Sequence, residues 1–283
     1  MPDSFDHCEA LVRAADKDRF LATLFAPARC RRPLFALYAF NIEVARVREL
    51  AREPMPGEIR LQWWRDVFSE AGGSEARAHP VAAALTNTIV RYRLPLSAFS
   101  DLIEARAFDL YDDPMPSLEA LEAYAGKTSA ALIVLAMLIL EEGKSTGLGT
   151  LAGHAGIAHA IAGLLASLGQ HAARRQLYVP LDVLRRHGAR VEDVFAGKAT
   201  LELCAALAEM RLHARRHLTE AKALMASAPP AAMPALLPAS LARVMLDRME
   251  RRSYDPFKVV EVPQWRRQWA LWRAARRPAQ MFD

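Results

Sequence analysis

Residues 37–49 read LYAFNIEVARVRE, and residues 164–180 read LLASLGQHAARRQLYVP. Both stretches are rich in Ala, Leu, Arg and Glu or Gln, residue types that favour helices over strands. The rest of the chain shares this composition, with few β-branched runs and only 13 glycines among 283 residues. The sequence therefore predicts an all-α protein.

Proline and glycine divide the chain into about ten helical patterns. The predicted helices cover residues 4–25, 29–52, 58–71, 80–93, 96–110, 117–142, 150–175, 199–226, 237–252 and 263–277. Residues 54–57 and the proline-rich segment 226–238 have the composition of turns and are predicted to separate helices. No internal repeat is present, and we predict a single domain over residues 1–283.

Charge and cysteine content narrow the function classes. The net charge is +5, but the arginines alternate with Asp and Glu, which indicates solvated surface pairs rather than a nucleic-acid site. Cys8, Cys30 and Cys204 lack metal-type spacing and are expected to be buried, reduced thiols. The acidic N-terminal residues 1–6 do not resemble a signal or transit peptide, so a cytoplasmic location is expected.

Two segments are apolar enough to be considered as membrane spans. Residues 128–140 form an apolar run of about 13 residues, short of the roughly 20 that a span needs. Residues 150–169 are long enough, but their histidines and many small residues suit a packed interior. Both segments are therefore expected to be buried core helices.

Small residues recur at every third or fourth position of the second segment, at Gly153, Gly156, Ala160, Gly163 and Ser167. This spacing places them on one face of a helix. Such a face permits close helix packing, its commoner use, or leaves room for a ligand. Both interpretations stay open from the sequence.

Motifs of several common site types are missing. The sequence has no Gly-rich phosphate loop, no nucleophile elbow and no Cys-His zinc spacing. Glu43 and Arg46, three residues apart, have the spacing of an ordinary surface pair on a helix. No metal site is therefore predicted from these patterns.

A series of landmarks from about residue 15 to residue 255 resembles the squalene/phytoene synthase family. These landmarks are residues 19–21 (RFL), 36–40 (ALYAF), 61–65 (LQWWR), 121–124 (LEAY) and 178–182 (YVPLD). The resemblance implies an isoprenoid synthase fold, a helical bundle around a central cavity in which two prenyl diphosphates condense. By the same resemblance, candidate residues of the cavity are Phe20, Tyr38, Ile42, Lys127, Gly163, Gln170 and Tyr178.

The resemblance also implies where metal ligands should lie, and most of them are missing. Family members hold Mg²⁺ with two Asp-x-x-x-Asp pairs, a spacing that puts both carboxylates on one helix face. Those positions are Ala45 and Glu49 in the first pair, and Ser167 and His171 in the second. One glutamate cannot assemble a multi-ion Mg²⁺ clamp, so no cofactor is expected unless the chain is an active enzyme.

The pattern of losses resembles a branch of the family that acts as an assembly factor for respiratory complex I. This resemblance is carried by residues 19–27, 41–49, 57–66 and 254–257. It implies a protein that is not an enzyme and whose partner is a complex I subunit or assembly intermediate. Two alternatives stay open: an active prenyl transferase of the squalene/phytoene type, and a carrier of isoprenoids or lipids. In the first of these, Glu49, Ser167, Gln170 and His171 would form an altered site, with His171 as ligand of a softer metal.

The predicted helix 263–277 has an aromatic face and a basic face. Trp265, Trp269 and Trp272 follow at i, i+4 and i+7, and arginines occupy much of the remainder. A helix of this kind can lie peripherally on the inner face of the cytoplasmic membrane or dock on a partner. The alternative is that the tryptophans close over the protein's own core.

Overall fold

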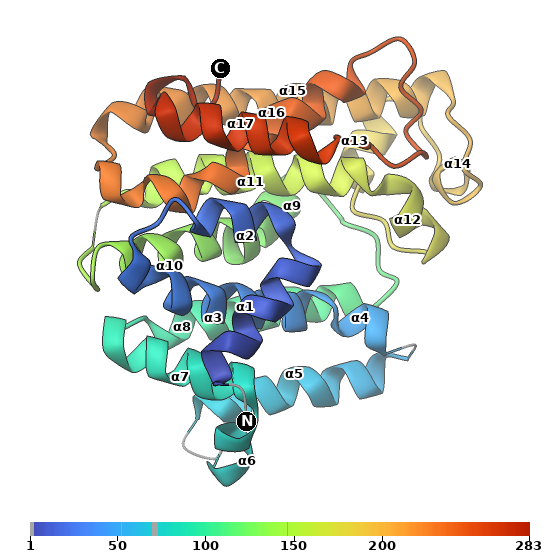
Figure 1. Ribbon diagram of the computed structural model, residues 1–283. Helices are drawn as coiled ribbons and strands as arrows, with labels where there is room; N and C mark the ends of the chain where they lie inside the picture. Colours follow the sequence, from blue (N-terminus) through green and yellow to red (C-terminus); the bar gives the residue numbers. More distant parts are fainter. Residues whose placement is uncertain (1–2, 52, 70–72, 146) are drawn as a thin grey trace. The chain divides into compact units, whose positions relative to one another are not determined.

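The computed structural model describes residues 3–51, 53–69, 73–145 and 147–283. Within these ranges the chain forms α-helices, short 3₁₀-helices and a π-helical turn, and no β-strand (Figure 1). The prediction of an all-α protein is confirmed. The chain folds as two compact units. The single domain over residues 1–283 stays a prediction.

The first unit comprises the described parts of Met1–Tyr111, Ala131–Gly149 and Ala228–Leu237. α3 lies at its centre, in contact with α1, α7 and α10, and every residue from 34 to 42 is buried. This helix therefore packs around its circumference rather than on one face. The unit contains α1 (Ser4–Ala15), α2 (Lys17–Thr23), α3 (Ala28–Ala45), α4 (Val47–Leu50), α5 (Pro54–Phe68), α6 (Gly73–Ala78), α7 (Pro80–Tyr92), α8 (Leu96–Ala107), η2 (Phe108–Leu110), α10 (Ala131–Leu140) and η5 (Pro230–Ala232).

Aromatic side chains hold α5 and α8 against α3. The ring of Phe40 meets Trp64 edge to face at a centroid distance of 4.9 Å and Phe99 at 5.5 Å. Phe68 and Phe99 complete the cluster at 5.1 Å. Pairs of this geometry contribute about 0.5–1.5 kcal/mol beyond the burial of their area. The segment 36–40 thus supplies the centre of this core.

The second unit comprises Asp112–Ala130, Thr150–Ser227 and Pro238–Asp283. It contains α9 (Leu118–Ala125), the π-helical turn η3 (Gly126–Ala130), nearly all of α11 (Gly149–Ala166), α12 (Leu168–Ala173), α13 (Leu181–Arg186), α14 (Val191–Phe195), α15 (Leu201–Leu224), η4 (Met225–Ser227), most of α16 (Met233–Met249), α17 (Gln264–Arg276) and η6 (Pro278–Gln280). Arg215 joins α15 to α16 through ion pairs with Asp247 and Glu250, each at 2.7 Å.

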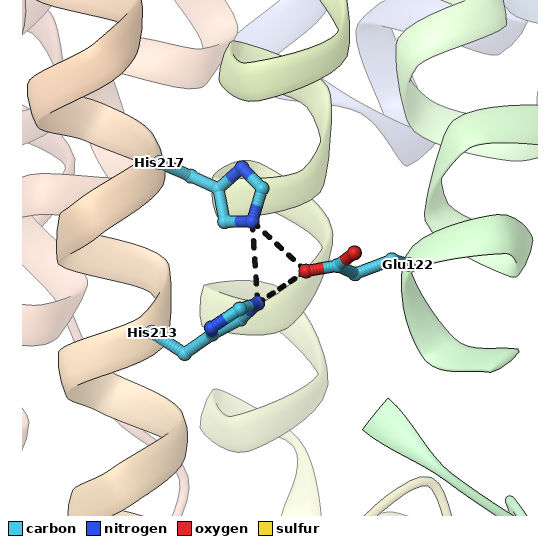
Figure 2. A group of neighbouring side chains, drawn as sticks. All are labelled: Glu122, His213 and His217. Atoms are coloured by element: carbon cyan, nitrogen blue, oxygen red, sulfur yellow. Dashed lines mark hydrogen bonds and ion pairs between the residues drawn. The ribbon is translucent and has the colours of Figure 1, made fainter. Parts of the chain in front are cut away.

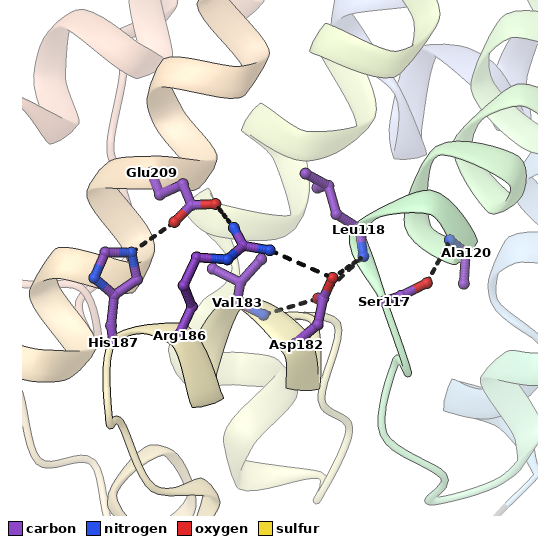
Figure 3. Close-up of polar contacts among 8 residues, drawn as sticks. All are labelled: Ser117, Leu118, Ala120, Asp182, Val183, Arg186, His187 and Glu209. Carbon is purple, nitrogen blue, oxygen red and sulfur yellow. Dashed lines mark hydrogen bonds and ion pairs between the residues drawn. The ribbon is translucent and has the colours of Figure 1, made fainter.

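Asp182 joins the start of α13 to the start of α9 (Figure 3). Its Oδ1 accepts hydrogen bonds from the backbone N–H of Val183 at 2.8 Å and of Leu118 at 3.2 Å. The hydroxyl of Ser117 caps α9 as well, by accepting from the N–H of Ala120 at 3.1 Å. Because the first N–H groups of a helix have no partner within the helix, these acceptors favour helix initiation at both places.

Several predicted helix boundaries are wrong. Pro54 begins α5 instead of preceding it, since proline is well suited to the first turn of a helix. α16 begins at Met233 and continues through Pro238, inside the predicted turn. Helices predicted as continuous are interrupted at Asp16, Arg46 and Ser167, and α13 and α14 lie in a segment for which no helix was predicted. The predicted helix ends at residues 52 and 70–71 lie outside the described residues.

Two further expectations need correction. Cys8 and Cys30 are buried as predicted, but Cys204 is exposed, because it lies on the outer side of α15. The helical run Leu118–Leu140 has 23 residues, so the argument that it is too short to span a membrane is wrong. This run and Gly149–Ala166 are both long and apolar enough to cross a membrane, although buried core helices meet the same criterion; their most apolar windows are 67% and 44% buried.

Candidate functional site

The first pair of metal-ligand positions lies in the first unit, where α3 gives way to α4. Ala45 is the last residue of α3, and Arg46 leaves helical geometry with φ −95° and ψ 5°. Glu49 lies in α4, and one of its carboxylate oxygens is 3.1 Å from Nε of Arg46. The one carboxylate of the pair therefore already faces a cation from its own segment.

The second pair lies in the second unit, where α11 gives way to α12. Ser167 separates the two helices with φ −107° and ψ 15°. The N–H of His171 nevertheless donates to the carbonyl of Ser167 at 3.0 Å, so the two residues remain one helical turn apart. The His171 ring lies 4.8 Å from that of Tyr178. This pair therefore keeps the helical spacing of the motif, but a hydroxyl and an imidazole stand in place of its two carboxylates.

These residues do not fit a magnesium cluster. Mg²⁺ requires hard oxygen ligands in near-octahedral geometry, which proteins supply mainly with carboxylates. The four positions offer a methyl group, a hydroxyl, an imidazole and one carboxylate that is ion-paired with Arg46. Imidazole suits softer metals, and a hydroxyl does not offset the charge of the ion.

Three of the seven candidate cavity residues lie in the first unit. Phe20, on α2, stacks on Phe35 with a centroid distance of 5.5 Å. Tyr38 is buried on α3 with the Arg19 guanidinium 5.6 Å from its ring centre, and burial raises the pKa of Tyr38 to about 12. Ile42 is buried one turn further along α3.

The other four lie in the second unit. Lys127, in η3, and Gln170, on α12, are exposed. Gly163 of α11 has open space where a side chain would begin. Tyr178 is buried, with the ring of Tyr124 at 5.9 Å. The prediction that all seven residues line one cavity stays a prediction.

A hollow within the first unit contains the half-buried carboxyl group of Glu43, which the sequence pattern assigned to the surface. The cavity has a volume of ≈ 580 Å³, and its walls include Glu43, Val47, Trp63, Trp64 and His79. Burial raises the pKa of Glu43 to about 7, against the opposing charge of Arg60, and burial lowers the pKa of His79. Their nearest polar atoms are 3.7 Å apart, too far for a hydrogen bond. The predicted surface pair of Glu43 with Arg46 is wrong, since Arg46 faces Glu49.

A cluster of histidines with one glutamate in the second unit was also missed. His213 and His217 project from α15 toward Glu122 of α9 (Figure 2). The spacing of the two histidines, four residues apart on a helix, was visible in the sequence. Glu122 was not linked to them, because 91 residues separate it from His213.

The tryptophans of α17 face outward. The exposed fractions of Trp265, Trp269 and Trp272 are 62%, 57% and 44%. The buried residues of the helix are instead Leu271 and Ala274. The alternative that the tryptophans close over the core of their own unit is therefore wrong.

The amino-acid sequence is similar to those of several known proteins. The sequence pattern of the squalene/phytoene synthases matches residues 12–273. NADH dehydrogenase (ubiquinone) complex I assembly factor 6 of Rattus norvegicus is 30% identical over 257 residues, which cover 91% of this chain and 77% of that protein. Chloroplastic phytoene synthase 2 of Solanum lycopersicum is 27% identical over 271 residues, covering 91% of this chain and 84% of that protein.

The fold also matches solved structures. A crystal structure of a dehydrosqualene synthase with bound ligand aligns with a TM-score of 0.84, covering 98% of this chain and 96% of that chain at 16% sequence identity. At this identity the likeness shows the fold alone. It confirms the predicted isoprenoid synthase fold, and the sequence matches confirm the predicted resemblance.

Proposed function

Because the chain belongs to the squalene/phytoene synthase family, we propose that it is a non-catalytic member that acts in the assembly of respiratory complex I. The observation that carries the proposal is the chemistry of the four metal-ligand positions. The second pair retains the helical spacing of the family, and the four positions together offer one carboxylate, which is ion-paired with Arg46.

The missing carboxylates matter because of the reaction that the family motif serves. Condensation of prenyl diphosphates requires pyrophosphate to leave, and bound Mg²⁺ neutralises the charge that develops on it. A Lewis-acid ion of this kind supplies several kcal/mol of transition-state stabilisation, and each 1.4 kcal/mol lost slows a reaction about tenfold. No described group at Ala45, Ser167 or His171 replaces the lost anionic oxygens.

The similarity to assembly factor 6 supports the second half of the proposal. That relative is matched over most of its own length, so the resemblance is not confined to one motif. We infer that the partner of this chain is a complex I subunit or an intermediate in its assembly.

Deletion of the gene tests this function. The amount of active complex I is expected to fall severalfold, while squalene-derived and phytoene-derived lipids stay at wild-type levels. Restoring the wild-type gene or a Glu49→Ala variant should recover complex I equally, because the carboxylate of Glu49 has no catalytic task in this account. Normal complex I activity in the deletion strain would exclude an assembly role.

We also propose that the chain binds peripherally to the inner face of the cytoplasmic membrane through Trp265, Trp269 and Trp272, its tryptophan face. Two of these rings carry arginines beside them, with Arg266 5.1 Å from the centre of Trp265 and Arg276 5.5 Å from that of Trp272. Aromatic rings insert at the level of lipid headgroups, and each nearby arginine adds about 1 kcal/mol of attraction to anionic lipid.

Replacing all three tryptophans by alanine is expected to weaken binding to phosphatidylserine-containing vesicles about tenfold or more, as the apolar contact is lost. Vesicle flotation measures this directly. The double variant Leu201→Ala/Leu212→Ala removes exposed apolar side chains from α15 of the same unit and should float like the wild type. Equal flotation of the triple variant and the wild type would rule out this mode of binding.

A further inference from the structure

Three side chains of the second unit direct metal-binding atoms at one point (Figure 2). Nε2 of His213 lies 2.5 Å from Oε1 of Glu122, and Nε2 of His217 lies 3.2 Å from the same oxygen. The two Nε2 atoms are 3.2 Å from each other. The three atoms therefore form a small triangle rather than a chain of separate contacts.

The secondary structure explains why these atoms converge. His213 and His217 stand four residues apart on α15, which puts both rings on the same face of the helix. Glu122 approaches that face from α9. The side chains of His213 and His217 are 18% and 12% exposed, and that of Glu122 is 35% exposed, so the cluster is partly shielded from solvent.

The distances between the three ligand atoms suit a metal ion with tetrahedral coordination. Zinc binds histidine nitrogen and carboxylate oxygen at about 2.0–2.2 Å, so two of its ligand atoms lie about 3.3 Å apart. Two sides of the observed triangle have this length, and the third is shorter by less than an ångström. A separate pair in the same unit, His187 and Glu209 at 2.6 Å, gives the ordinary arrangement of one imidazole on one carboxylate.

A fourth residue fixes the orientation of one imidazole. Nδ1 of His154, on α11, lies 2.9 Å from Nδ1 of His217. When His217 donates its Nδ1–H to Nδ1 of His154, Nε2 of His217 keeps its lone pair toward the cluster. Ligand histidines in metalloproteins usually have such a partner on the second ring nitrogen.

From this geometry we propose that His213, His217 and Glu122 bind a zinc ion, although the sequence analysis predicted no metal site. Two imidazoles favour zinc over magnesium or calcium, which prefer all-oxygen sites. Three protein ligands leave a fourth position for water or an external ligand, and the ion links α9 to α15. The proposal is independent of the assembly role and of the family motif positions.

Zinc binding to the tag-free full chain tests the proposal. Equilibrium dialysis with metal analysis is expected to give one tightly bound zinc per chain. His213→Ala and His217→Ala should each weaken binding by more than the roughly 10- to 100-fold that loss of an outer partner costs, and His154→Phe should fall within that range. His187→Ala, which removes a histidine from the matched His–Glu pair, should bind zinc like the wild type.

Two outcomes of the dialysis would overturn the assignment: a wild-type chain that retains no zinc, or a His187→Ala variant that loses as much affinity as His213→Ala. Circular dichroism identifies any variant that fails to fold. In that case the wild-type chain loaded with Co²⁺ decides, since a four-coordinate site gives strong visible absorption bands. A spectrum like that of the hydrated ion would equally contradict the site.

Discussion

Gly156→Ala is expected to lower the free energy of unfolding by about 1–3 kcal/mol, the range of overpacking in a well-packed core. A Cβ atom at this position would lie 2.5 Å from the backbone nitrogen of Ala130 and 2.7 Å from its Cβ. The neighbour belongs to the π-helical turn η3, so backbone rather than a flexible side chain would have to move. Urea denaturation monitored by circular dichroism measures the effect.

Two glycines of the same helix provide matched controls. A Cβ atom on Gly153 or Gly163 would meet nothing within 4 Å. Replacing a glycine inside a helix by alanine then removes its entropic penalty, so Gly153→Ala and Gly163→Ala are each expected to stabilise the protein by about 0.5–1 kcal/mol. If Gly156→Ala proves as harmless as these two, the close contact of α11 with η3 is wrong.

Glu43→Gln is expected to remove a loss of stability that the wild type undergoes as the pH rises. The folded pKa of Glu43 is about 7, above the value of 4.5 in the unfolded chain, because burial disfavours the charged carboxylate. A raised pKa contributes stability that is fully present below pH 4.5 and is lost as the pH rises through 7. Glutamine does not ionise, so the variant does not undergo this loss of stability as the pH rises.

The unfolding free energy of the variant relative to wild type should therefore rise by about 2–3 kcal/mol between pH 4.5 and pH 8. Denaturant titrations across this interval measure the difference, which includes the loss of the Glu43 charge 3.7 Å from His79. Glu220→Gln, on the exposed side of α15 and outside its first and last turns, serves as the control and should leave the pH dependence of wild type unchanged. A difference that stays flat, or falls with pH, would show that Glu43 is not in a desolvated site.

The sequence predicted the fold class because composition and helical periodicity act locally. Residues 29–52 were predicted to be helical, and α3 covers Ala28–Ala45 of this range. Several helix boundaries were predicted wrongly, because a proline can either end a helix or lie in its first turns. Pro54 and Pro238 read as breaks, yet the first begins a helix and the second lies within one.

Side-chain partners were harder to predict, since they depend on tertiary contacts. Arg46 has a glutamate three residues before it, Glu43, and another three residues after it, Glu49. It pairs with Glu49, and the end of α3 at Ala45, which favours this partner, could not be predicted from the spacing. The small-residue face of α11 was predicted to serve either close helix packing or a ligand. Gly156 is closely packed, whereas Gly153 and Gly163 lie beside open space. Glu122 joins His213 and His217 only because α9 and α15 meet in the folded unit.

The central claim is that this protein does not catalyse prenyl transfer. Ala45, Ser167 and His171 offer no carboxylate, and Glu49 alone cannot hold the Mg²⁺ ions that the reaction requires. Incubation of the purified chain with farnesyl or geranylgeranyl diphosphate and Mg²⁺, followed by analysis of the extracted lipids, tests it directly. We predict no condensed C30 or C40 product above a boiled control. Product that accumulates with time and enzyme concentration would contradict the account.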